Sequence, residues 1–480
     1  MWFGKHNSHR ARASGIGRGS FACAEPLERR LHLADVARFV HVYVFYDTNR
    51  DGIRQAGEPG IKNWPVTMRG LSYSGGPAPD TASGYTNSVG RVSFVDHSQF
   101  DFFPASALAI IGANGRYRTT SGQRKNLAGQ WYGYAQPRIT FAMTDIGPVS
   151  GRLLNSFTLS DGTPVSTPLT GRTVFADDNR NGVLDRGEAS GTTDLNGKYT
   201  LTLRSGTHTI RAIPGQAADW AATPGEALAH KVSVYQDRPL PTFSATLIDP
   251  TVIDVVVAYT DNAAEQRSDI QMRAHVQELF NDANGVFANS DTNVLLNLKD
   301  TLRVRYAESG NLHTDLERLR NPADHRLDQV VSFRDTRKAD LAMLLVGGGQ
   351  ADGEVIGVAY QFARGSGSDT LAYSVVALQD DADSDAFTIA HEIGHNLGAG
   401  HDREHAEGDA APIASYAYGY RYRALNGRTY QDVMAYGSGI VLPFFSTPRY
   451  SYAGKPIGSA AYADNARVIR ELADEVAAYR

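Results

Sequence analysis

The stretch HEIGHNLGAGH, residues 391–401, decides how the C-terminal half of this chain is interpreted. His391 and His395 are four positions apart, so on an α-helix their side chains lie on one face, with β-carbons roughly 5–6 Å apart. Both imidazoles can therefore reach one metal ion. Glu392 lies one position around the helix, where its carboxylate can reach a metal-bound water without binding the metal itself.

The second half of the same stretch supplies a third ligand. Gly398 can adopt the left-handed conformation that ends a helix, so the chain can turn back and bring His401 to the metal. Three neutral imidazoles and a fourth position left to water form a catalytic zinc site, because a structural site is closed by a fourth side chain. The sequence therefore predicts one catalytic Zn²⁺ bound by His391, His395 and His401. The alternative is a helix that carries these histidines by coincidence.

These positions resemble the extended zinc motif of the metzincin clan of endopeptidases. The clan also has a methionine-containing turn beneath the metal, and DVMAYG supplies one here with Met434. Asp402, directly after the third histidine, resembles the reprolysin-like branch, whereas Tyr436 is more similar to the turns of astacins and serralysins. The sequence from the methionine turn to the C-terminus is most similar to bacterial peptidyl-Asp metalloendopeptidases, and the resemblance covers roughly residues 250–480.

The resemblance implies an endopeptidase that acts on proteins or peptides. Glu392 would take the proton of the attacking water and pass it to the leaving amine. Tyr436 would stabilise the oxyanion; the alternative is a packed aromatic side chain. Met434 would form an apolar floor without a chemical part. Cleavage on the amino side of Asp is also implied, and it would need a cation near the turn, for which Arg449 and Arg364 are the candidates.

Two other functions stay open at this stage. One is a surface adhesin or binding protein with an inactive protease-like domain, although the three histidines and the glutamate are intact. The other is a zinc amidase that acts on cell-wall peptides, although the third histidine together with a methionine turn favours protein substrates.

Two stretches in the N-terminal half repeat one pattern, VFYDTNRDGIRQAGEPG at 44–60 and VFADDNRNGVLDRGEAS at 174–190. In each, Asp or Asn recurs at alternate positions, a glycine follows, and a glutamate closes the run at the twelfth position. This is the spacing of a calcium loop, in which one backbone carbonyl also contributes at the seventh position. Ordinary turns use the same residue types, but two copies with the glutamate in register favour calcium.

The repeats predict two sets of calcium ligands. The first set is Asp47, Asn49, Asp51, the carbonyl of Ile53, and Glu58, with Gln55 at the ninth position. The second set is Asp177, Asn179, Asn181, the carbonyl of Val183, Asp185 and Glu188. Calcium here would be structural, because it compensates carboxylates that the loop brings together, and millimolar calcium outside the cell would suffice.

Short strand-like runs flank both loops, such as HVYVFY and RTVFA, and no EF-hand helices accompany them. We expect a small antiparallel sandwich at 37–145 and another at 146–246. Both resemble the calcium-binding B-type modules of bacterial surface proteins, which are prealbumin-like or Cna-B-like and imply association with a cell surface. The predicted fold class is therefore two all-β prealbumin-like sandwiches followed by an α+β metzincin catalytic domain at 250–480. The proline-containing segment 237–251 is interpreted as the linker.

Within the catalytic domain, the order of elements suits a mixed sheet with helices. IDVVVAYT at 253–260 is a continuous apolar run, typical of a strand buried on both faces. The helix that follows has its apolar residues at helical spacing from Met272 to Phe287. We expect the edge strand that binds an extended peptide to lie within 357–376.

Composition narrows the partners and the compartment. The chain has 480 residues, enough for about three domains, and its net charge of −5 argues against a nucleic-acid partner. The longest apolar runs are too short to span a membrane. Cys23 is the only cysteine, so no disulfide can form within the chain, and we interpret it as a bystander.

Residues 1–36 are predicted to be a basic leader. They lack the uninterrupted apolar core of a secretory signal. EPLERRLHLAD at 25–35 nevertheless resembles the LEPR-type segment near the N-termini of large exported proteins of planctomycete-like bacteria. We interpret the leader as an export or processing region of a bacterial protein that is secreted or located at the cell surface; the alternative is a plain tail.

Overall fold

The structure is a computed structural model that describes the chain from residue 38 onward, with internal gaps. The described residues are 38–71, 80–96, 108–111, 118–119, 124–126, 138–234, 239–348, 355–364, 368–379, 381–406 and 412–480. The predicted leader, with Cys23, lies outside them. No helix among the described residues is long and apolar enough to cross a membrane.

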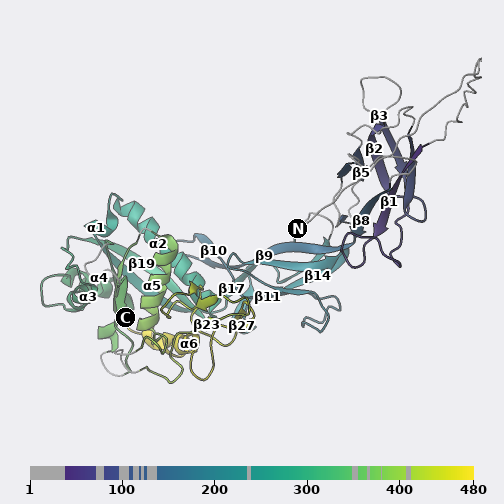
Figure 1. Cartoon of the computed structure of the whole chain (residues 1–480). Helices are drawn as coiled ribbons and strands as arrows, with labels where there is room; N and C mark the ends of the chain where they lie inside the picture. Colours follow the sequence, from purple (N-terminus) through teal and green to yellow (C-terminus); the bar gives the residue numbers. More distant parts are fainter. Residues whose placement is uncertain are drawn as a thin grey trace, which may run out of the picture. The chain divides into compact units, whose positions relative to one another are not determined.

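The chain divides into two compact units (Figure 1). The first lies within residues 1–44, 59–112 and 123–140, and the second within 45–58, 113–122 and 141–480. The predicted first module at 37–145 therefore contributes to both, because its calcium loop belongs to the second unit.

Strands of the first unit bury alternate residues, as expected for sheets with one face in a core. Val40, Val42 and Val44 are fully buried in the first strand, whereas His41 between them is half-buried. The strands β1 (Arg38–Tyr46) and β4 (Arg91–Asp96) pair antiparallel. A second sheet has the order β3-β2-β5-β7, from β3 (Asp80–Tyr85), β2 (Pro65–Leu71), β5 (Leu108–Ile111) and β7 (Arg124–Asn126).

The second unit contains a complete β-sandwich, which we call the second sandwich. One sheet has the order β10-β9-β17-β15, with β13 also paired to β9, from β9 (Ile146–Thr158), β10 (Pro164–Pro168), β13 (Lys198–Arg204), β15 (Trp220–Ala222) and β17 (Thr242–Leu247). The other has the order β12-β11-β14-β16, from β11 (Thr173–Ala176), β12 (Ser190–Thr192), β14 (Gly206–Ile213) and β16 (Ala229–Val234). The sheets share one core, in which Val174 and Ile210 of one meet Leu201 and Phe243 of the other.

The interpretation of 237–251 as a linker is wrong. Thr242–Leu247 forms β17, which pairs parallel with β9 inside the second sandwich. Three residues then separate β17 from β18 (Thr251–Thr260), the first strand of the next sheet. The prolines at the start of this segment led to the wrong prediction. They lie outside the paired residues of β17, so they remove no hydrogen bond between the strands.

The C-terminal part of the second unit is built on a five-stranded sheet. Its order is β19-β18-β20-β22-β21, from β18, β19 (Val294–Val304), β20 (Leu341–Val346), β21 (Gly357–Ala359) and β22 (Tyr373–Ala377). All neighbours are parallel except β21, which is antiparallel to β22 at the edge. The edge strand thus lies within the range expected from sequence.

Helices cover both faces of this sheet (Figure 1). They are α1 (Asp261–Ala264), α2 (Asp269–Asn289), α3 (Leu312–Arg320), α4 (Asp328–Arg337), α5 (Ala382–Asn396) and α6 (Asn465–Val476), with a 3₁₀ turn at Ser368–Leu371. In β18, Val255 and Val257 face the core of α2 and α5, while Val256 faces that of α3 and α4. The continuous apolar run of this strand therefore reflects burial on both faces, as predicted.

The remaining strands are short. Near the C-terminus they are β23 (Arg421–Arg423), β24 (Thr429–Gln431), β25 (Ile440–Val441), β26 (Ser451–Tyr452) and β27 (Lys455–Pro456). Earlier in the chain, β8 (Arg138–Thr144) pairs with β6 (Arg118–Thr119) through Thr144 and Met143.

Gly394 lets α5 approach the chain beneath it. A β-carbon added at Gly394 would lie 2.7 Å from Phe445 Cε1 and 3.1 Å from Met434 Sδ. Phe445 also packs edge-on against Phe287 of α2, with ring centroids 4.9 Å apart. The position of α5 thus depends on the lack of a β-carbon at residue 394.

We expect Gly394→Ala to lower the thermal unfolding midpoint. Overpacking a buried contact of this kind costs about 1–3 kcal/mol. Gly285→Ala in α2 is the matched control, because its β-carbon would meet Thr167 Cβ at 3.6 Å, an ordinary contact. That control should unfold at or above the wild-type temperature, since Ala favours helix over Gly by about 1 kcal/mol. A Gly394→Ala variant as stable as Gly285→Ala would contradict the packing argument.

Candidate metal centre

Three imidazole nitrogens converge at the C-terminal end of α5. His391 Nε2 lies 3.1 Å from His395 Nε2 and 3.2 Å from His401 Nε2, and the last two are 3.0 Å apart. Tetrahedral Zn–N bonds of about 2.0–2.1 Å separate the nitrogens by roughly 3.3 Å. The three predicted ligands are therefore already at the spacing of a shared metal ion.

Backbone carbonyls determine which nitrogen of each helix histidine carries the proton. His391 Nδ1 donates to Val433 O at 2.7 Å, and His395 Nδ1 donates to Ala399 O at 2.9 Å. Their Nε2 atoms then carry lone pairs, which face each other without a proton between them. Such an arrangement fits a bound cation, and outer contacts of this kind orient metal ligands.

Burial keeps these two imidazoles neutral. It lowers the pKa of His391 to about 4, with a smaller contribution from His401, and it lowers the pKa of His395 well below its usual value. Metal ions bind the neutral imidazole. At neutral pH no proton has to leave either side chain before a metal binds.

Glu392 lies between α5 and the edge strand. Its side chain is buried, its Oε2 has no hydrogen-bond partner among the described residues, and burial raises its pKa well above the usual value. A β-carbon at Gly357 of β21 would overlap Glu392 Oε1. The carboxylate therefore sits beside the strand along which an extended peptide would pair, and a nearby divalent cation would favour its ionised form.

The methionine turn passes beneath the metal centre. Met434 is fully buried, and its backbone N–H donates to Asp432 Oδ1 at 3.0 Å. Asp432 also accepts from Tyr420 N at 3.1 Å, and burial raises the pKa of Asp432 to about 8. This buried carboxylate thus holds the turn, a role that the sequence pattern did not reveal.

Tyr436 reaches the centre from the rim. Its hydroxyl lies 3.1 Å from His401 Nε2, and 45% of its surface is exposed. Its backbone N–H donates to Asp402 Oδ2 at 2.9 Å, and the same carboxylate bonds His405 Nδ1 at 2.9 Å. Asp402, which sequence reasoning used only to choose a branch of the clan, therefore ties the third histidine to the tyrosine.

Two features of the structure favour glycine at position 398. Its φ is +90°, in the region that side chains disfavour. A β-carbon there would also lie 2.5 Å from Leu472 Cδ1 and 3.1 Å from Val468 Cγ1 of α6. The turn that brings His401 to the other histidines is thus packed directly on the last helix.

The two arginines considered for substrate binding lie elsewhere. Arg449 pairs with the buried Asp291, with Nη1 and Oδ2 3.1 Å apart. Arg364 is exposed, and its charge acts on Glu471 of α6. The structure brings neither to the three histidines.

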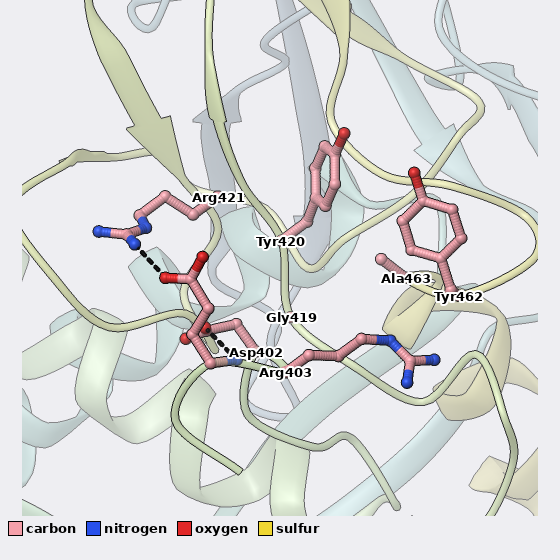
Figure 2. Close-up of a pocket in the computed structure, with 8 residues that line it drawn as sticks. Asp402, Arg403, Gly419, Tyr420, Arg421, Tyr462 and Ala463 are labelled. Carbon is pink, nitrogen blue, oxygen red and sulfur yellow. Dashed lines mark hydrogen bonds and ion pairs between the residues drawn. The ribbon is translucent and has the colours of Figure 1, made fainter.

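A different arginine, Arg421, lies near Tyr436. It lines a pocket of about 150 Å³ (Figure 2). The pocket is lined by Asp402, Arg403, Glu404, Gly419, Tyr420, Arg421, Tyr462 and Ala463. Arg421 Nη1 is 2.5 Å from the place of a β-carbon on Gly437, the residue after Tyr436. Its guanidinium forms an ion pair with the exposed Glu404.

Both predicted calcium loops belong to the second unit and share a hydrogen-bond pattern. In the second loop, Gly182 N donates to Asp177 Oδ2 at 3.1 Å, and Asp185 N donates to Glu188 Oε2 at 3.0 Å. The amides of Asn179 and Asn181 both bond Asp185 Oδ2 at 2.6 Å. Asp177 Oδ1 is buried and has no hydrogen-bond partner in the described part of the chain, while Oδ2 also accepts from Arg211.

The first loop repeats the two contacts that backbone N–H groups make. Gly52 N donates to Asp47 Oδ2 at 3.0 Å, and Gln55 N donates to Glu58 Oε2 at 3.0 Å. Asn49 Nδ2 bonds Asp51 Oδ2 at 3.0 Å. The side chains of Ile53 and Val183, whose carbonyls were the predicted ligands, point into solvent.

Comparison with known proteins shows what the C-terminal part of the chain is similar to. Residues 249–463 match the family model described as metallo-peptidase family M12B, reprolysin-like. A peptidyl-Asp metalloendopeptidase of Stenotrophomonas maltophilia (strain K279a) is 34% identical over 234 residues, which are 48% of this chain and 53% of that protein. One of Xanthomonas campestris pv. campestris is 30% identical over 281 residues, 58% of this chain and 64% of that protein. The chain thus spans about half to two thirds of the length of these relatives.

Two solved structures show weak similarity to this chain. The alignment with a chain of a chaperone–substrate complex covers 72% of this chain and 43% of that chain, with 13% identity and a TM-score of 0.38. The alignment with a minor pilin of Streptococcus agalactiae covers 44% of this chain and 97% of the pilin chain, with 13% identity and a TM-score of 0.19. Scores this low carry no argument. Residues 249–463 therefore match a reprolysin-like metallopeptidase domain of family M12B in sequence, and they contain the three histidines whose nitrogens lie at metal-binding distance from one another.

Proposed function

We propose that the protein is a zinc-dependent endopeptidase that hydrolyses peptide bonds of proteins. The observation that carries this proposal is the set of three facing Nε2 atoms with the buried Glu392 carboxylate beside them. Bound zinc would polarise the scissile carbonyl and lower the pKa of a water ligand towards about 7. The neutral imidazoles of His391 and His395, and a third ligand, His401, that is only half-buried, suit that use of the ion.

Side chains around the metal centre would handle the protons and the developing charge. Glu392 accepts a proton from the attacking water and then donates it to the leaving amine. The Tyr436 hydroxyl, 3.1 Å from His401 Nε2, donates a hydrogen bond to the oxyanion. An extended substrate pairs with the edge strand β21, and Gly357 in that strand brings the peptide close to the Glu392 carboxylate.

Glu392→Gln tests the proposed general base. The amide cannot accept the proton, so cleavage of casein should fall by about 100-fold or more, while zinc content stays that of the wild type. Zinc content is measured by elemental analysis and cleavage by release of soluble peptides. A variant that cleaves at near the wild-type rate would refute the assignment. A zinc-loaded wild type that cleaves no protein would favour an inactive binding domain or an amidase.

We further propose cleavage on the amino side of Asp, with Arg421 as the cation that binds the substrate carboxylate. The relatives named above are peptidyl-Asp metalloendopeptidases. Arg421 lies beside Gly437, next to the tyrosine at the metal centre. Its present partner Glu404 is 71% exposed in its side chain, so a substrate carboxylate can replace it at the guanidinium with little loss.

Arg421→Gln should therefore lower kcat/KM for peptides with Asp after the cut, by about 10-fold or more, because a charge-assisted hydrogen bond contributes about 1.5–3 kcal/mol. Peptides with Ala at that position should be cleaved as by the wild type. Arg423→Gln is the control, an exposed arginine two residues away. Equal losses for both peptides, or no enrichment of Asp in cleaved peptide libraries, would reject the specificity proposal.

We also propose that the two repeated loops bind structural calcium and that the protein acts outside the cell. The shared hydrogen-bond pattern supports the first proposal, as does Asp177 Oδ1, a buried oxygen that none of the described residues bonds. Modules that bind calcium at about 0.1–1 mM are suited to extracellular calcium, which supports the second. The B-type resemblance of the modules further suggests association with a cell surface.

Calorimetric titration of the full chain should find two calcium ions. Asp177→Asn should reduce this number to one and remove part of the calcium-dependent rise in unfolding temperature. Asp194→Asn, in a turn of the same sandwich where Asp194 accepts from Asn196 N, is the control and should keep both ions. Identical titrations for Asp177→Asn and the wild type would exclude the second loop as a calcium site.

A further inference from the structure

The second sandwich is joined to the metallopeptidase domain by a buried arginine. Arg172, directly before β11, is fully buried. Its Nη2 donates to the carbonyls of Ala288 at 2.7 Å and Asn289 at 2.9 Å, at the end of α2. Its guanidinium carbon also lies 3.7 Å from the ring centroid of Tyr450. One side chain of the sandwich therefore ties α2 to the segment that follows the methionine turn.

A buried carboxylate crosses the same interface in the opposite direction. Asp291, fully buried after α2, accepts from Trp220 Nε1 of the sandwich at 2.6 Å. Its other oxygen pairs with Arg449. Removing a partner from a buried charge is destabilising. Loss of the sandwich would leave this charge without one of its partners and would uncover Ala288, which belongs to the sandwich core.

Contacts continue from this interface to a metal ligand. The Phe444 ring packs on Gly171, where a β-carbon would lie 3.3 Å from its Cζ. Phe444 O accepts from Val433 N at 2.9 Å, and Val433 O accepts the Nδ1 proton of His391 at 2.7 Å. The carbonyl that orients His391 is thus held by a residue that packs directly on the second sandwich.

Phe445 adds a second route. Its backbone N–H donates to Ser290 Oγ at 2.8 Å, just beyond α2, and its ring lies under Gly394 of α5. Ser290 immediately follows Asn289, whose side-chain oxygen accepts from Thr170 N of the sandwich at 2.8 Å. Both routes end at the helix that carries the histidines.

We infer that the second sandwich is a permanent part of the catalytic unit and that Arg172 is a positioning residue for His391, acting through the segment 444–450. The inference rests on the proposed function only in taking His391 as a metal ligand. It implies that processing which produces an active enzyme leaves residues 146–247 attached, so the sandwich is neither a removable propeptide nor a loosely tethered targeting module.

The test uses Arg172→Met in the full chain, with Arg152→Met as the matched control. Arg152 is an exposed arginine of the same sandwich, on β9. Zinc loss to a competing chelator is measured well below the unfolding temperature. Arg172→Met should release zinc roughly 10-fold faster than the wild type, since outer contacts change metal affinity by about 10–100-fold, and Arg172→Lys should partly restore retention. Arg152→Met should match the wild type.

Equal zinc release by folded Arg172→Met and Arg152→Met would overturn the inference. If Arg172→Met does not fold, Trp220→Phe replaces it, because that change removes the hydrogen bond to Asp291 and part of the buried ring at the same interface; zinc release unchanged from Arg152→Met would again overturn the inference. Sequencing the N-terminus of the most active purified species gives an independent readout. We expect it to begin before residue 146, and an equally active species that begins after 247 would overturn the inference. Absence of peptidase activity in every species would count against the proposed function instead, because zinc retention is measured without a substrate.

Discussion

The mutual orientation of three imidazoles is the constraint on which the rest of the catalytic region depends. Their Nε2 atoms lie 3.0–3.2 Å apart. The Nε2 lone pairs of His391 and His395 repel at that distance unless a cation lies between them. The carbonyls of Val433 and Ala399 accept the Nδ1 protons, so these two rings cannot change tautomer without losing a buried hydrogen bond. The contacts behind the histidines and a metal in front of them therefore stabilise each other.

This orientation is held from several parts of the chain. The helix α5 is buried between α2 and the methionine turn, and Gly394 lets Phe445 and Met434 pack close beneath it. Gly398 allows the sharp return to His401 and packs on α6. The segment after the methionine turn contacts the second sandwich. A close-packed interior transmits small displacements, so the metal centre depends on elements far from it in sequence.

Many features of the fold and the site could be predicted because they depend on local spacing. The positions of His391, Glu392 and His395 on one helix follow from a four-residue period. The buried strand at 253–260 and the apolar face of α2 follow in the same way. Single residues whose contacts join distant parts of the sequence could not be predicted. Asp402 binds the backbone of Tyr436, and Asp432 holds the methionine turn, but an isolated Asp has no pattern that distinguishes it from a surface residue.

By itself, the sequence determined the three histidines with their glutamate, the methionine turn after them, and the two repeated acidic loops, because each is a short motif whose spacing dictates its geometry. Only the tertiary structure decided that Arg449 neutralises Asp291 while Arg421 lies beside the tyrosine at the metal centre. It also decided that 242–247 is a strand of the second sandwich and that Arg172 joins this sandwich to α2. Such partners lie tens to hundreds of residues apart, and packing rather than local spacing brings them together.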